Sequence, residues 1–203
     1  MSDLLLILLP GAMYFWILFI GQWPLQEVLQ EQQTRVLPRI LSCPVAPVQY
    51  VLAKLIRCFV LCALTTVLLL VASALMFGIR WGNPLKLGLV VFAWAASMSG
   101  LLALVFALAR TKEQANVLSP MVLMLCAMLG GGMFPYENLP AVLQALGQYT
   151  PNRWAVLAML GVVRAKPAAE LLVPITALLA LGVAGNLLGL ALLRRRLAAG
   201  DRA

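Results

Sequence analysis

The hydrophobic positions of the chain fall into five long apolar runs separated by short polar stretches. The runs cover residues 4–21, 55–78, 87–109, 117–133 and 171–193. Runs of about twenty residues are long enough for an α-helix to cross some 30 Å of hydrocarbon. A transmembrane β-barrel would instead show alternating apolar and polar residues. The pattern therefore predicts an all-α, polytopic membrane protein that forms a single transmembrane domain over residues 1–203 and has about five transmembrane helices.

Residues 25–41 show a different pattern, in which apolar residues recur at helical spacing with polar residues between them. This pattern is typical of an amphipathic surface helix and is too polar for a span. We expect Pro38 to end or kink the helix near Leu37. We expect Pro44 and Pro47 to hold the next stretch extended.

Two short apolar stretches, residues 141–146 and 154–163, lie between the fourth and fifth runs and are separated by Thr150, Pro151 and Asn152. Neither is long enough to cross a membrane. Irregular backbone at membrane depth must be covered by protein or line a cavity. Residues 134–166 are therefore predicted to form a re-entrant or interfacial helical hairpin.

Small and polar residues inside the runs predict contacts between helices. The third run contains Ala96 and Gly100, and the last contains Gly185 and Gly189 at a spacing that allows close helix packing. Asn186 is the clearest polar side chain within a run. We favour a hydrogen bond between helices for Asn186 over contact with a substrate.

The charges of the chain indicate its topology. The sequence has 203 residues, is 63% hydrophobic and 11% charged, and has a formal net charge of +8. Its Lys and Arg residues stand at the ends of the runs, not along a soluble face, so nucleic acid is not an expected partner. Ten of the fifteen fall on one side of a five-span arrangement. By the positive-inside rule, this side is cytoplasmic. The N-terminus and the hairpin are then outside, and residues 25–41 and the C-terminus are inside.

An N-terminal signal peptide is the alternative for the first run. Only Asp3 is charged ahead of that run, so the basic region of a signal peptide is missing. No small-residue cleavage site follows it. These observations favour a first span.

The sequence lacks the residues that several kinds of chemistry require. No G-x-x-x-x-G-K-[ST] motif occurs, so we expect no ATP binding through a P-loop and no enzymatic activity in this chain alone. We expect no metal and no cofactor, because the chain has no His and its four cysteines lack further ligands nearby. All seven acids lie outside the runs, which argues against intramembrane proteolysis and against ion-coupled transport. A conduit driven by another protein remains, with a structural membrane anchor as the alternative.

Four motifs in order resemble the type-2 ABC exporter permeases over nearly the whole chain. They are residues 31–45 followed by Lys54; Ala109, Arg110 and Thr111 with Gln114 and Ala115; residues 131–135 with Leu139 and Pro140; and residues 150–155. The chain differs in having Gln33 where the family commonly has a second acid, and Arg35 and Val36 where it favours Gly-Thr. The family usually has six spans, so the chain is similar to the C-terminal, five-span part of such a permease, as a truncated reading frame or one half of a split protein.

The resemblance implies a transmembrane subunit of an exporter in the bacterial inner membrane. Its partners would be a cytoplasmic ATP-binding subunit, a second permease copy in a homo- or heterodimer, and the lipid bilayer. Its cargo would be amphipathic or lipid-like, of drug, lipid or glycan class. Residues 25–41 would be the coupling helix. Its Glu27, Glu31, Arg35 and Arg39, and Pro44 just after it, would contact the ATPase. The hairpin would be an external gate formed by Phe134, Pro135, Glu137, Pro140, Pro151 and Trp154. The alternative is a membrane anchor or assembly subunit that does not transport.

Overall fold

The computed structural model describes residues 20–34, 36–41, 46–79, 81–109, 111–132 and 136–200, and in these ranges every regular element is a helix. The prediction of an all-α protein is therefore confirmed. The elements are α2 (Trp23–Gln33), α3 (Val36–Leu41), α4 (Pro47–Phe77), α5 (Pro84–Leu108), α6 (Lys112–Leu129), the 3-10 helix η1 (Tyr136–Asn138), α7 (Ala141–Gly147), α8 (Pro151–Val163) and α9 (Ala168–Gly200).

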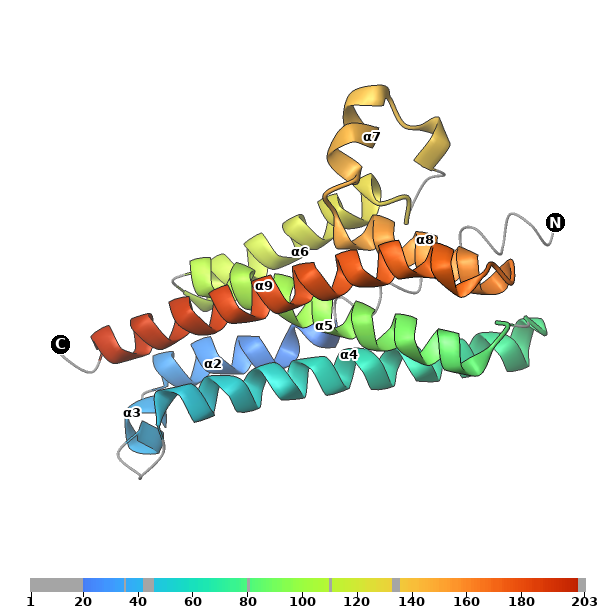
Figure 1. The fold of residues 1–203 in the computed structure, drawn as a ribbon. Helices are drawn as coiled ribbons and strands as arrows, with labels where there is room; N and C mark the ends of the chain where they lie inside the picture. The colour runs from blue at the N-terminus through green and yellow to red at the C-terminus, as the bar shows by residue number, and fades with distance from the viewer. Residues whose placement is uncertain are drawn as a thin grey trace.

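The three long helices α4, α5 and α9 form an elongated bundle with α5 in the middle (Figure 1). α5 packs against α4, α8 and α9, and its Trp94 and Phe106 are among the largest fully buried side chains. α2 and α3 lie at the same end of the bundle as the start of α4 and the end of α9 (Figure 1). η1 and α7 project from the body nearer the opposite end. The bundle therefore has two different ends, one formed by α2 and α3 and the other by the connections from α4 to α5 and from α8 to α9.

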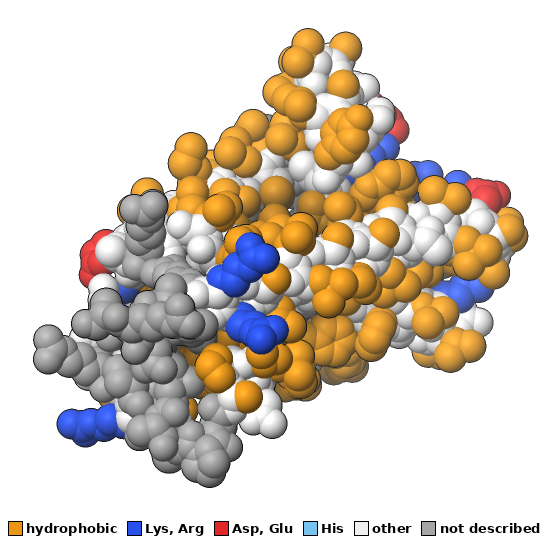
Figure 2. Space-filling model, turned by 60° about the vertical axis from the view of Figure 1, so that its left-hand side comes forward, with side chains coloured by type: hydrophobic (Ala, Val, Ile, Leu, Met, Phe, Trp, Pro, Cys, Tyr) orange, Lys and Arg blue, Asp and Glu red, His pale blue; other side chains and the backbone are white. Residues whose placement is uncertain are grey.

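Three helices of the described part of the chain, α4, α5 and residues Ala168–Arg195 of α9, are long and apolar enough to cross a membrane. Figure 2 shows a broad band of hydrophobic side chains on one flank, with charged side chains toward its two ends. α6 covers part of the fourth apolar run but is not among the three. Residues 4–19 of the first run lie outside the described residues. The number of five spans therefore stays a prediction.

The boundaries near α3 and α4 differ from those that the prolines suggested. Residues 25–41 are not one continuous helix, because α2 ends at Gln33 and α3 begins at Val36. Pro38 lies in the first turn of α3, where its missing N–H has no acceptor within the helix and the residue is tolerated. Pro47, which we expected in an extended stretch, is the first residue of α4. Proline fits the first position of a helix, because its missing N–H would have no acceptor within the helix there. α4 therefore begins well before residue 55, where the second apolar run starts.

The tight turn before α5 has the residues that its geometry requires. Gly82 has φ of 81°, a conformation that side chains with a Cβ rarely adopt. The Oδ1 of Asn83 accepts a hydrogen bond of 2.9 Å from the backbone N–H of Leu85. Asn83 is thus an N-cap, and Pro84 in the first turn needs no acceptor.

Glycines bring α5 and α9 into direct backbone contact. A Cβ on Gly185 would lie 2.8 Å from the carbonyl carbon of Gly100, and one on Gly189 would lie 2.5 Å from the Cβ of Ala103. The Nδ2 of Asn186 donates to the Ala96 carbonyl at 3.0 Å. The small-residue prediction and the interhelical hydrogen bond predicted for Asn186 are both confirmed. We call this contact between α5 and α9 the glycine seam.

Candidate functional site

The apolar face of α2 packs on protein. Leu25, Val28 and Leu29 are 0%, 3% and 2% exposed, and α2 contacts α4, α5 and α6. The amphipathic pattern was therefore correctly recognised. These apolar side chains of α2 are buried against neighbouring helices of the same chain, while its position relative to a membrane stays a prediction.

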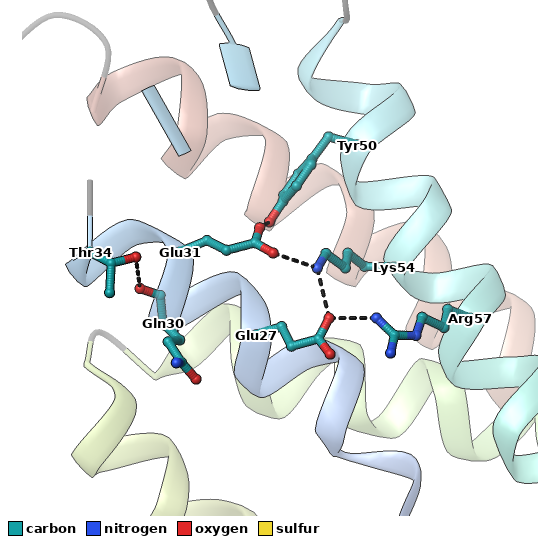
Figure 3. A network of polar contacts seen from close by, with 7 residues as sticks. All are labelled: Glu27, Gln30, Glu31, Thr34, Tyr50, Lys54 and Arg57. Atoms are coloured by element: carbon teal, nitrogen blue, oxygen red, sulfur yellow. Dashed lines mark hydrogen bonds and ion pairs between the residues drawn. The ribbon is translucent and has the colours of Figure 1, made fainter. Parts of the chain in front are cut away.

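The polar face of α2 turns two acids toward α4 (Figure 3). The Nζ of Lys54 donates to an oxygen of Glu27 and to one of Glu31, each at 2.9 Å. Arg57 donates to Glu27 at 2.6 Å, and the hydroxyl of Tyr50 donates to Glu31. We call these five residues the ion cluster. It fastens α2 to the first turns of α4.

Helical spacing on both partners produces the ion cluster. Glu27 and Glu31 are four residues apart on α2, and Tyr50, Lys54 and Arg57 follow at intervals of four and three on α4. Residues at these spacings share one helix face. Complementary charges at matching spacing were therefore visible in the sequence, although their pairing was not predicted. Lys54 turns inward to the two acids.

The members of the ion cluster are shielded from water to different degrees, so they differ in how much they contribute to stability. The side chain of Lys54 is 13% exposed and that of Glu31 is 25% exposed, whereas that of Arg57 is 56% exposed. Exposed ion pairs contribute little to stability, while a shielded charge that loses its partner is costly. Lys54 is therefore the central member of the cluster.

Glu27 is held in its charged form by the cluster. Partial burial alone would raise the pKa of Glu27, but the hydrogen bonds and charges of Lys54 and Arg57 outweigh it. The pKa of Glu27 is consequently lowered from its ordinary value, and the carboxylate is ionised at neutral pH.

A second set of contacts joins α2 to the start of α6. The Nε2 of Gln33 donates to an oxygen of Glu113 at 3.2 Å, and the Nζ of Lys112 donates to Gln30 at 3.0 Å. The pKa of Glu113 is lowered by its own backbone N–H, by the Thr111 hydroxyl and by Gln33. α2 is thus tied to two neighbouring helices by polar contacts as well as by its apolar face.

The residues predicted to contact an ATPase separate into three groups. Glu27 and Glu31 are engaged with α4 inside the chain. Arg39 is exposed on α3, next to the exposed Val36 at the end of the bundle (Figure 1). Arg35 and Pro44 lie outside the described residues. Of the predicted contact residues that the structure describes, Arg39 on α3 is the exposed one.

The four described residues of the predicted external gate differ in their surroundings. Glu137 in η1 and Pro140 before α7 are exposed on the projecting part. Pro151 is buried at the start of α8, and the Nε1 of Trp154 donates to the Gln148 carbonyl at 2.9 Å. Phe134 and Pro135 lie outside the described residues.

The hairpin region is firmly attached through α8. α8 packs against α5 and α9 and buries Ala155, Met159 and Val162. The guanidinium of Arg153 lies 3.6 Å from the centre of the Tyr136 ring, which connects α8 to η1. The two predicted helices of the hairpin are present. Their relation to the membrane stays a prediction.

A groove of about 360 Å³ opens on the flank of the bundle between α4, α5 and α9. It is lined by Leu52, Leu55, Ile56 and Phe59 of α4, by Phe92, Ala96 and Ser99 of α5, and by Asn186, Leu187 and Leu190 of α9. We call it the flank groove. Sequence reasoning did not find it, because its walls come from three helices that are far apart in the chain and whose mutual rotation no local pattern gives.

Comparison with known proteins gives one family and one relative. The family described as "ABC-2 family transporter protein" matches residues 2–191. The Linearmycin resistance permease protein LnrN of Bacillus subtilis (strain 168) is 24% identical over 129 residues. These residues are 64% of this chain and 34% of LnrN, so the chain matches about a third of that relative's length. No solved structure matches the chain.

Proposed function

The chain belongs to the ABC-2 family of transporter proteins and is a membrane transport component, and from this premise we propose that it is the permease subunit of an exporter driven by a separate ATPase. The absence of a P-loop motif supports a separate chain as the source of energy. The observation that best supports ATPase coupling is the ion cluster, because it connects the end of the bundle to a long apolar helix.

The contacts of α2 suggest how a push at one end would move the bundle. α3 lies at the end of the bundle, and α2, which precedes it, is fastened to α4 by the ion cluster and to α6 by Gln33 and Lys112. A force on α3 would therefore displace α2 together with the first turns of α4 and α6. Packed interfaces convert such small shifts into rigid-body rearrangements.

The surface offered to the ATPase is α3. Val36 of this helix is 41% exposed, and the acids of α2 are engaged with α4 inside the chain. In this proposal the ATP-binding subunit holds α3 in a groove, and Glu27 and Glu31 transmit the movement without touching the partner. A second permease copy would complete the transmembrane part of the exporter.

The proposed cargo is an amphipathic or lipid-like compound. None of the acids of the chain falls within the predicted spans, which disfavours a small ion. LnrN is named for resistance to linearmycin, and we propose a comparable role in moving a compound out of the cell. The proposed site of action is the bacterial inner membrane, with the C-terminus in the cytoplasm.

Co-purification with an ATP-binding subunit, sought among the genes that neighbour the gene of this chain, tests the proposal. Val36→Asp places a charge on the exposed surface of α3, in the first helical turn, where an acid suits the helix itself. We expect retention of the ATPase to fall about tenfold, as for loss of one well-packed interface contact, and transport to fall with it.

Val142→Asp is the matched control, because it makes the same change at a residue of α7 that is 72% exposed. It should leave retention of the ATPase unchanged. If Val36→Asp and wild type retain the ATPase and transport cargo equally, α3 is not the coupling surface. If the wild type neither retains an ATPase nor transports, the chain is an anchor or assembly subunit.

A further inference from the structure

The flank groove has a buried floor and exposed rims. Leu55 and Ser99 on its floor are 4% and 2% exposed, whereas Ile56, Phe92 and Leu187 on its rims are 54%, 56% and 62% exposed. The groove therefore opens sideways from the bundle toward the surrounding lipid. Its volume of about 360 Å³ lies within the range of small-molecule sites.

We propose that the flank groove holds the alkyl chain of the exporter's amphipathic cargo, which enters from the bilayer; the assignment to cargo rests on the proposed function. Eight of the ten lining residues are apolar, so an alkyl chain can fill the groove without leaving polar atoms unpaired. The rings of Phe59 and Phe92 meet edge to face with centres 5.2 Å apart and form one wall.

The rims favour a flexible chain over a helix of a second copy. Helices that pack closely in membranes use small residues at the contact, as the glycine seam does with Gly100 and Gly185. The rims of the groove carry Ile56, Phe92 and Leu187, which would keep another helix at a distance from the floor. An alkyl chain is thin enough to pass between them.

The polar residues of the groove are hydrogen-bonded within the protein, which limits the contacts that they can make with a headgroup. The Nδ2 of Asn186 donates a hydrogen bond to the Ser99 hydroxyl. It also donates to the carbonyls of Ala96 and Gly182. Lys54 and Arg57 project from the other face of α4 toward α2. None of the described residues that line the groove is charged. The headgroup of the cargo therefore stays outside the groove, and the alkyl chain alone occupies it.

α4 gives this groove a direct connection to the ion cluster. Residues 52, 55, 56 and 59 face the groove, and residues 50, 54 and 57 face α2. These two sets alternate over the same three turns of one helix, at the 100° per residue of an α-helix. Any displacement of α2 that moves this part of α4 changes the width of the groove.

Photolabelling of the full chain in phosphatidylcholine nanodiscs tests the proposal. The probe is a long-chain alcohol with a diazirine on its alkyl chain, and labelled residues are located by mass spectrometry. We expect saturable labelling on the walls of the groove, competed by excess unlabelled alcohol. Ile56→Trp and Leu187→Trp, which obstruct the groove from opposite walls, should each lower this labelling about tenfold.

Val67→Trp is the matched control for Ile56→Trp. Val67 is 45% exposed on the same helix, and eleven residues along an α-helix bring it back to nearly the same face, about 16 Å away. Labelling of the groove should stay unchanged in this variant.

Three results would overturn the proposal. Labelling that excess alcohol does not compete, or that is equally strong around Val67, would make the groove ordinary lipid-facing surface. A cross-link to another copy from a photoreactive residue placed at Leu187 would assign the groove to a dimer contact. If transport with the ATPase proceeds normally in Ile56→Trp and Leu187→Trp, the groove is not on the cargo path, although the proposed function itself stands. Groove labelling without any transport would instead contradict the proposed function.

Discussion

Lys54 forms ion pairs with two acids of one neighbouring helix. Its side chain is 13% exposed, and Glu27 and Glu31 both accept from it at 2.9 Å. A single side chain therefore compensates two carboxylates. Within the described part of the chain, Arg57 pairs with Glu27 alone, and its side chain is largely exposed.

We predict that Lys54→Met destabilises the protein more than Arg57→Gln. Removing Lys54 leaves two partly shielded acids without their main partner, which should cost about 1–2 kcal/mol after allowance for their partial exposure. Arg57→Gln removes an exposed pair and should cost less than about 1 kcal/mol. Unfolding in detergent micelles, followed by circular dichroism, measures both. Equal losses would show that Lys54 is not the centre of the cluster.

The ion cluster also changes how a charge reversal at Glu31 should be interpreted. Glu31→Lys would place a second ammonium group beside Lys54 and the Tyr50 hydroxyl. Loss of transport in that variant would follow from a loosened α2 as readily as from a lost partner contact. For this reason a substitution on the outer surface of α3 is the better test of ATPase binding.

At the scale of elements, α5 contains two glycines with opposite surroundings. A Cβ on Gly100 would lie 2.7 Å from the Gly182 carbonyl oxygen and 3.0 Å from the Asn186 backbone nitrogen. A Cβ on Gly88 would meet nothing within 4 Å. The two positions therefore separate the need for close helix packing from the general cost of glycine in a helix.

We predict that Gly100→Ala destabilises the protein by about 1–3 kcal/mol, because the methyl group meets backbone that has no room to move. Gly88→Ala should be neutral or stabilising by up to about 1 kcal/mol, since alanine is the better helix former. Thermal unfolding of the two variants in the same detergent gives the comparison. Similar behaviour of both would mean that the glycine seam does not hold α5 and α9 together.

The elements that the sequence predicted well are those in which one strong local signal decides the outcome. Long apolar runs predicted α4, α5 and α9. The helix starts were less accurate, because a proline is equally consistent with the end of one helix and the first turn of another. Pro38 and Pro47 both proved to be of the second kind.

The candidate site was predictable only in part, for a reason of geometry. The acids of α2 and the polar residues of α4 were visible in the sequence, but their pairing depends on the two helices running side by side. The flank groove depends on the rotation of three helices around the glycine seam. Such a rotation is set by packing across the whole bundle.

At the scale of the whole molecule, the two ends of the bundle match the two sides predicted from charge. The start of α5 lies at the end opposite to the end of α9 (Figure 1). Lys86 belongs to the predicted outer set of basic residues, and Arg194 and Arg195 belong to the larger inner set. Charge and architecture thus agree on which helix ends share a side.

We predict that reporter fusions at Lys86 are extracytoplasmic and that fusions at Arg196 are cytoplasmic, because ten of the fifteen basic residues lie on the predicted inner side. A fusion at Leu4 should be extracytoplasmic if the first apolar run is a span. Alkaline phosphatase and green fluorescent protein fusions report the two sides. Finding Leu4 and Arg196 on the same side would contradict five spans.

The glycine seam has a consequence for how the chain is made. α5 and α9 are separated by roughly sixty residues, which a ribosome adds in about 3–12 s. Throughout that interval the newly inserted α5 has no α9 against which to pack Gly100 and Ala103. The hydrogen bond between Ser99 and Asn186 is also not yet formed. The packing of the central helix of the bundle is thus completed only when α9 has been synthesised. Nascent chains that stall before α9 emerges will present the small-residue face of α5 to the insertion machinery and to membrane proteases.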